Sequence, residues 1–206
     1  MFKRTLILTV IIVVVASVAV VRIAKLRGRG PRSIASERAP AAKANVAVAV
    51  SDLQPDELIA AAKAPAAPEF AKGNWINADP LTLNKLRGHV VLVEFWTFGC
   101  YNCRNTLPSV KEWDARYRER GLTVVGVHTP ETQSEYVIDN VRREVPGLGI
   151  KYPVVTDNDY TTWKAYGVEA WPTILVLDKQ GRIRWLHVGE GRYEETESVI
   201  KTLLTE

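Results

Sequence analysis

The chain has 206 residues, 47% of them hydrophobic, which is enough for one well-packed domain and an additional segment. Its net charge of +4 is unevenly distributed, because residues 1–40 contain 8 Lys and Arg against 1 Glu, whereas the remainder contains 19 basic and 22 acidic residues. A nucleic-acid-binding domain would carry its basic excess on the folded part, so we expect no nucleic-acid partner. The 2 cysteines are separated by two residues, which excludes a framework of several structural disulfides.

An apolar segment runs from Thr5 to Val21 without a charged residue. As a helix it would span roughly 26 Å at ~1.5 Å per residue, near the lower limit for crossing a bilayer. A cleaved signal peptide is the alternative, because Lys3 and Arg4 precede the segment and small residues lie near its end. The segment is long for a signal peptide and basic residues follow it, so we expect an uncleaved membrane anchor with basic flanks over residues 1–29.

Residues 30–68 are rich in Ala and Pro and predict an extended tether. The folded domain is expected over residues 69–206. β-branched apolar runs at 90–96 and 122–128 predict strands buried on both faces, with a helix over 101–120 between them. A strand, a helix and a strand over this length imply a parallel, right-handed crossover.

Weaker periodicities follow along the rest of the chain. They predict a helix near 132–145, a strand at 152–156, a short helix at 159–166, a hairpin of strands at 173–178 and 182–188, and a final helix from about Glu194. A crossover followed by a hairpin and a helix indicates an α/β fold whose mixed central sheet has helices on both faces.

Cys100 and Cys103 lie where the first predicted strand gives way to a helix. Unpaired N–H groups and the helix dipole at such a junction lower the pKa of a thiol. The spacing places Cys103 one turn behind Cys100, from where it can attack a mixed disulfide formed on Cys100. We therefore expect Cys100 to be the nucleophile and Cys103 the resolving thiol, with no metal or organic cofactor.

Other uses of a cysteine pair fit the sequence less well. Zinc needs four ligands, and His89, His128 and His187 are scattered singly. A covalent haem would need His directly after the second cysteine, where Arg104 stands. A static disulfide is a further alternative, although so small a loop stabilises little.

The string VLVEFWTFGCYNC, followed by Pro108 and by AWPT some seventy residues later, resembles the thioredoxin family. From WINADPLTLNKLRGHVV through GVHTPE to GEGRYEETESVIKTLL, the chain is similar to the thioredoxin-like domain of DipZ-type proteins and related membrane-anchored thiol–disulfide oxidoreductases. The resemblance covers about residues 70–206. It implies a thioredoxin-like fold and disulfide exchange with protein thiols and disulfides. The electrons for this exchange would come from a membrane or soluble electron donor.

The resemblance also implies roles for residues outside the cysteine pair. The Trp171–Pro172 peptide bond is expected to be cis, to face the cysteines and to bind a substrate chain, the alternative being a Pro that merely opens a strand. Glu94 matches a buried acid that exchanges a proton with the resolving cysteine, the alternative being a side chain that reaches solvent. A lone His128 at a strand end is expected to be structural or solvated.

Gly99 and the Tyr101-Asn102 dipeptide depart from thioredoxins, which usually have Trp before the first cysteine and Gly-Pro between the two. The redox potential of thioredoxins therefore cannot be assigned to the Cys100–Cys103 pair. Two alternative functions are a thiol peroxidase of the redoxin type, with Thr97 as the nearest candidate residue, and a Cu(I)-binding assembly factor.

The side of the membrane is ambiguous, because the basic residues after the apolar segment favour the cytoplasm. The resembled proteins act outside it, and a tethered reductase gains little in a reduced cytosol. We expect an extracytoplasmic, periplasmic domain on a single-pass anchor.

Overall fold

The computed structural model describes residues 52–206. The anchor expected over residues 1–29 and most of the expected tether lie outside this range. Within it, no helix combines the length and apolar character needed to cross a membrane.

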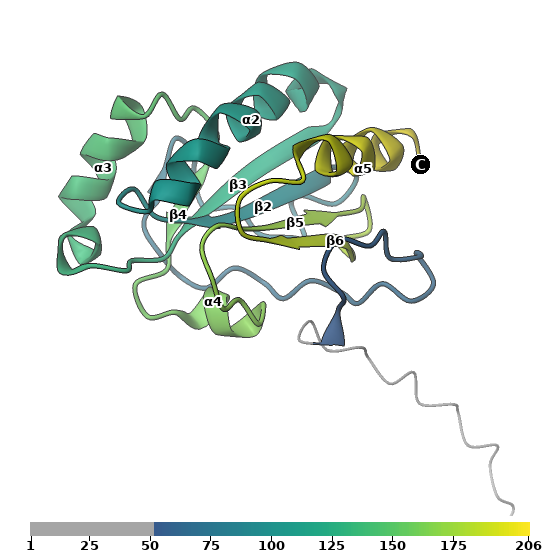
Figure 1. Ribbon diagram of the computed structural model, residues 1–206, viewed down its shortest axis with the longest axis horizontal. Helices are drawn as coiled ribbons and strands as arrows, with labels where there is room; N and C mark the ends of the chain where they lie inside the picture. Colours follow the sequence, from purple (N-terminus) through teal and green to yellow (C-terminus); the bar gives the residue numbers. More distant parts are fainter. Residues whose placement is uncertain (1–51) are drawn as a thin grey trace, which may run out of the picture. The chain divides into compact units, whose positions relative to one another are not determined.

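One mixed sheet forms the centre of the described chain, with the strand order β1-β4-β3-β2-β5-β6 (Figure 1). The strands are β1 (Trp75–Ile76), β2 (Val90–Trp96), β3 (Leu122–His128), β4 (Val154–Thr156), β5 (Thr173–Leu177) and β6 (Ile183–Val188). β2, β3 and β4 run parallel, whereas β5 is antiparallel to both β2 and β6, and β1 is antiparallel to β4. The predicted crossover, hairpin and mixed sheet are therefore confirmed.

The helices are α2 (Tyr101–Tyr117), α3 (Ile138–Gly147), α4 (Thr161–Ala165) and α5 (Tyr193–Thr205). A 3₁₀ turn, η2 (Arg118–Arg120), extends α2 to the predicted end at Gly121. The helix predicted near 132–145 is divided into the 3₁₀ turn η3 (Gln133–Tyr136) and α3, because Val137 between them adopts an extended conformation with φ −81° and ψ 109°.

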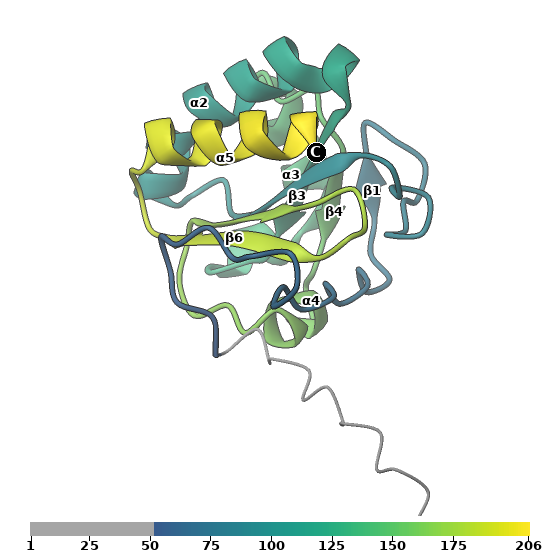
Figure 2. The same cartoon turned by 90° about the vertical axis from the view of Figure 1, so that its right-hand side faces the viewer.

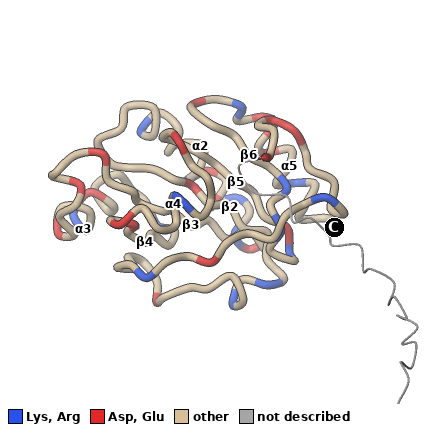
Figure 3. The backbone as a smooth tube through the Cα atoms, turned by 90° about the horizontal axis from the view of Figure 1, so that it is seen from below, with Lys and Arg blue, Asp and Glu red and all other residues tan. Residues whose placement is uncertain are grey.

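Alternate side chains of β2 face two separate cores, as strands buried on both faces require. Val90, Leu92 and Trp96 pack with residues of α2, α3 and α5. Val91 and Phe95 on the opposite face pack with residues around α4 and the start of the described chain. Figure 2 shows α2 and α5 on one side of the sheet and α4 on the other. Acidic and basic residues are interspersed along the fold (Figure 3).

The free edge of β6 is covered by the chain that precedes the expected domain start at residue 69. Asp56 N–H donates to Leu186 O at 2.8 Å, and Ile59 N–H donates to Arg184 O at 2.9 Å. Leu53 is buried in the core on the α4 side. The folded part therefore begins before residue 69. The segment before this residue pairs with backbone groups of β6 that an open sheet edge would leave unpaired.

Candidate functional site

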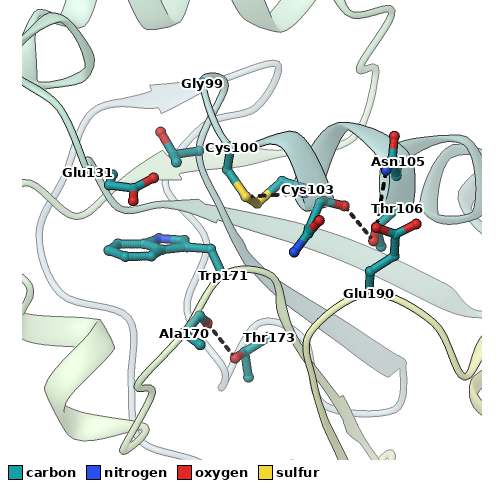
Figure 4. The surroundings of a disulfide bond; sticks show 12 residues. Gly99, Cys100, Cys103, Asn105, Thr106, Glu131, Ala170, Trp171, Thr173 and Glu190 are labelled. Carbon is teal, nitrogen blue, oxygen red and sulfur yellow. Dashed lines mark hydrogen bonds between the residues drawn. A yellow bond between two sulfur atoms is a disulfide. The ribbon is translucent and has the colours of Figure 1, made fainter.

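The cysteine pair lies at the junction of the sheet and α2. Cys100 is the N-cap residue of α2, in an extended conformation, and its Sγ accepts a hydrogen bond from Cys103 N–H at 3.2 Å. The two cysteines form a disulfide with their Cα atoms 5.3 Å apart (Figure 4). Cys100 is partly exposed, whereas Cys103 has no exposed surface. Only Cys100 is therefore accessible to the sulfur of a partner.

Glu94 is fully buried in β2, which rules out the alternative in which it reaches solvent. Its side chain shares the α2-facing side of β2 with Leu92 and Trp96, whose core also contains Cys103. The Tyr152 hydroxyl donates to Glu94 Oε2 at 2.9 Å. Burial raises the pKa of Glu94 to about 7, and the Tyr152 hydrogen bond partly opposes this rise. A carboxyl with such a pKa can take or give a proton near neutrality.

Gly126 on β3 gives Tyr152 access to Glu94. It pairs with Glu94 in the parallel register between β2 and β3. A Cβ atom at Gly126 would lie 2.8 Å from Trp96 Nε1 and 3.2 Å from Tyr152 Cε2. A side chain here would therefore displace the ring that supplies the hydrogen bond to Glu94.

The Trp171–Pro172 peptide bond is cis, as expected. Pro172 is buried, and the half-buried Trp171 ring lies beside the disulfide (Figure 4). Trp171 Nε1 donates to Thr129 O at 3.1 Å, which fixes the ring. Within the described part of the chain, the Trp171 backbone makes no hydrogen bond, whereas Pro172 O accepts one from Gly189 N–H at 2.8 Å. Trp171 thus offers backbone groups next to the cysteine pair.

His128 and Thr97 lie behind the loop that precedes Cys100. His128 is buried at the end of β3, its Nε2 atom is 3.2 Å from Thr97 Oγ1, and Phe98 stacks on its ring. Burial lowers the pKa of His128 to about 4, so the ring is neutral at physiological pH. The expectation of a structural role agrees with this environment, which makes His128 part of the support of the loop.

Two residues of the site carried no signal in the sequence. Tyr152 contacts Glu94 across 58 positions of the chain, and Glu135 accepts a hydrogen bond from Gly99 N–H at 2.8 Å across 36 positions. Neither belongs to a spaced motif, so only the tertiary structure brings them to the cysteines. Among residues 52–206, no group of three or more His, Cys, Asp or Glu is arranged to hold a metal ion.

Comparisons with known proteins agree with this geometry. Protein DipZ of Mycobacterium tuberculosis is 42% identical over 135 residues, which cover 64% of this chain and 19% of DipZ. Thiol-disulfide oxidoreductase ResA of Bacillus thuringiensis is 28% identical over 137 residues, covering 66% of this chain and 76% of ResA. The chain therefore corresponds to about a fifth of the length of the DipZ proteins.

A solved structure shows the same fold. The thiol:disulfide interchange protein of the thioredoxin family from Chlorobium tepidum matches with a TM-score of 0.59 and 24% identity, over 70% of this chain and 99% of that protein. The expected thioredoxin-like fold is thus confirmed. The model of the AhpC/TSA family matches residues 64–186, more than half of the sequence, and the chain belongs to this family.

Proposed function

We propose that this protein is a thiol–disulfide oxidoreductase that exchanges disulfides with protein partners. The observation that carries the proposal is the asymmetry of the cysteine pair, in which Cys100 is accessible at the N-terminus of α2 and Cys103 is fully buried. The similarity to ResA, a thiol-disulfide oxidoreductase, supports it.

The reaction begins with the reduced pair. The Cys100 thiolate attacks one sulfur of a partner disulfide, forms a mixed disulfide and releases the first partner thiolate. Cys103 then attacks Cys100 Sγ, which closes the Cys100–Cys103 disulfide and releases the second partner thiolate. The partner gains two electrons and the protein loses two, so a dithiol donor must reduce the pair again.

Glu94 supports the second step as a general base. The thiol of Cys103 must lose a proton before it attacks, and Glu94 lies on the same side of β2 with a pKa of about 7. The proton then passes to the departing partner thiolate. In the oxidising direction the same carboxyl returns a proton to Cys103.

The segment around Trp171 and Pro172 binds the partner chain. The unpaired backbone of Trp171 can pair with an extended partner segment, as strand addition does at a sheet edge. Tyr101, with 76% of its surface exposed, adds an apolar contact beside Cys100.

The experiment compares two oxidants of the reduced protein, a disulfide-bonded protein such as insulin and hydrogen peroxide. We expect catalysed reduction of the protein disulfide in the presence of a dithiol, with loss of activity in Cys100→Ser. Rapid stopped-flow oxidation by peroxide, without catalysis toward the protein disulfide, would instead identify a thiol peroxidase. Thr97 Oγ1 is already engaged with His128, which disfavours that alternative.

We also infer that residues 1–29 anchor the protein in a membrane, with the domain extracytoplasmic. The uncharged segment from Thr5 to Val21 supports an anchor. An exchange reaction with protein disulfides suits an oxidising compartment. A membrane-impermeant thiol reagent should label Cys100 in intact cells after mild reduction, and labelling only after lysis would contradict this orientation.

A further inference from the structure

The carboxylate of Glu135 holds two backbone segments together beside the cysteine pair. It has no exposed surface and accepts hydrogen bonds from Gly99 N–H at 2.8 Å and from Glu131 and Thr132 N–H, each at 2.7 Å. Burial raises the pKa of Glu135, but hydrogen bonds from Thr97 and from these backbone groups outweigh burial and hold it below its usual value. The group is therefore a carboxylate at neutral pH.

Gly99 leaves the space that this carboxylate occupies. A Cβ atom at Gly99 would lie 2.5 Å from Glu135 Oε1, a distance that Cβ atoms do not tolerate, and 3.5 Å from Glu135 Cδ. Gly99 does not have a positive φ, so its backbone conformation alone would permit a side chain. Glu135 thus occupies the space in which the Trp side chain usual in thioredoxins would begin.

The carboxylate acts against the features that stabilise a thiolate on Cys100. The N-terminus of α2 and the Cys103 N–H group favour the thiolate. The negative charge of Glu135, bound to the backbone of the residue before Cys100, disfavours a second negative charge on the Cys100 sulfur. Figure 4 places two other carboxylates, those of Glu131 and Glu190, around the disulfide. Both residues are exposed, so solvent screens their charges, and His128 is uncharged.

We propose that Glu135 is a positioning residue that fixes Gly99 ahead of Cys100 and, through its charge, makes the cysteine pair a stronger reductant. The inference rests on the proposed function. A dithiol whose thiolate is less stabilised has a less stable reduced form, so it gives its two electrons to a partner disulfide more readily. The site is therefore biased toward reducing the disulfides of its partners.

The test measures the reactivity and the redox equilibrium of the full chain without any partner protein. In a Cys103→Ser background, the rate of Cys100 alkylation by iodoacetamide is followed as a function of pH. We expect Glu135→Gln to lower the thiol pKa by about one unit. The thiolate fraction at pH values below that pKa then rises about tenfold, and alkylation becomes about threefold to fourfold faster, because a thiolate of lower pKa is intrinsically less nucleophilic. With both cysteines present, equilibration with glutathione at a pH above the thiol pKa of either variant should shift about tenfold toward the reduced pair, because only there is the thiolate the main form of Cys100.

Gly99→Ala tests the same contact without removing the charge. Its Cβ atom forces the carboxylate away from Gly99, so the alkylation rate and the glutathione equilibrium should change in the same direction as in Glu135→Gln. In a Glu135→Ala background, Gly99→Ala should add no change, because the opposing atoms are gone. Glu131→Gln is the matched control in the same loop, and we expect a change below about twofold since its charge is screened.

The proposal fails if folded Glu135→Gln keeps the alkylation rate and the glutathione equilibrium of the wild type within twofold. If circular dichroism shows that this variant does not fold, unchanged values in Gly99→Ala overturn the proposal. Neither readout involves a partner protein. A wild-type chain that is inactive toward protein disulfides would therefore refute the proposed function and leave the effect of Glu135 standing.

Discussion

Glu94, the residue proposed to transfer the proton, also makes the stability of the fold depend on pH. Its pKa is raised from 4.5 to about 7 by burial in the folded protein. Between these two pH values the folded protein holds a proton that the unfolded chain has lost. The contribution of Glu94 to the free energy of unfolding is therefore most favourable below pH 4.5, and declines as the pH rises to about 7.

Replacing Glu94 with Gln should remove this decline. The pKa shift corresponds to about 3 kcal/mol, so we expect Glu94→Gln to be more stable than the wild type by up to about 3 kcal/mol at pH 8 and by little at pH 4.5. Urea denaturation of the oxidised proteins over this pH range measures the difference. His128 also titrates, but its contribution to the free energy of unfolding is the same in both proteins and cancels in the difference between them.

Tyr152→Phe is the opposing variant. The Tyr152 hydroxyl lowers the pKa of Glu94, so its removal should raise that pKa further and extend the loss of stability above pH 7. A pH profile of Glu94→Gln parallel to that of the wild type would show that Glu94 is not the titrating group. A profile of Tyr152→Phe that stops declining at lower pH would contradict the effect of the Tyr152 hydroxyl on the pKa of Glu94.

Sequence reasoning found the residues of the site that lie in local patterns. The roles proposed for Cys100 and Cys103 rest on the strand–helix junction, and the burial of Glu94 follows from its place in a continuous apolar strand. Tyr152, just before β4, and Glu135, in η3, reach the site through tertiary contacts that leave no spacing in the sequence. Gly99 departs from the thioredoxin pattern in the sequence, but the reason for this glycine is the position of Glu135 in the fold.

At the scale of elements, β6 depends on the irregular chain before residue 69. Arg184 on β6 is buried, and its Nε atom donates to Ile59 O at 2.6 Å. Its Nη1 atom donates to Glu206 at 2.7 Å and lies 3.5 Å from Asp178. One side chain thus ties the edge strand, the preceding chain and the C-terminus together.

We expect Arg184→Met to lower the free energy of unfolding by about 3 kcal/mol. The change leaves Ile59 O without its donor and removes one cation from the buried Asp178. Urea denaturation at neutral pH measures the loss. Arg143→Met, at an arginine whose side chain is 67% exposed, is the control and should stay within about 0.5 kcal/mol of the wild type. Equal stability of the two variants would contradict the role given to Arg184.

The division between η3 and α3 shows a limit of periodicity. Residues 132–145 have a helical pattern, but the Glu135 side chain is used to bind backbone N–H groups of the preceding loop and of Gly99. The chain becomes extended at Val137 and restarts as α3. A helical pattern does not reveal that one of its side chains has a tertiary partner.

At the scale of the molecule, the order of the elements predicted the mixed sheet, because a crossover and a hairpin admit few arrangements. The folded part begins earlier than composition predicts, since residues 53–68 have the composition of a tether but pair with β6 and pack against the core on the α4 side. Composition shows that residues 53–68 lack a regular pattern. It does not show that an irregular segment can cover the free edge of a sheet.

The central claim is that Cys100 attacks partner disulfides and Cys103 resolves the product. Trapping measures it most directly: Cys103→Ser and Cys100→Ser chains are incubated with partner proteins and separated without reductant. The exposure of Cys100 and the burial of Cys103 predict mixed disulfides with Cys103→Ser and none with Cys100→Ser. Equal trapping by both variants, or trapping by Cys100→Ser alone, would contradict the assigned roles.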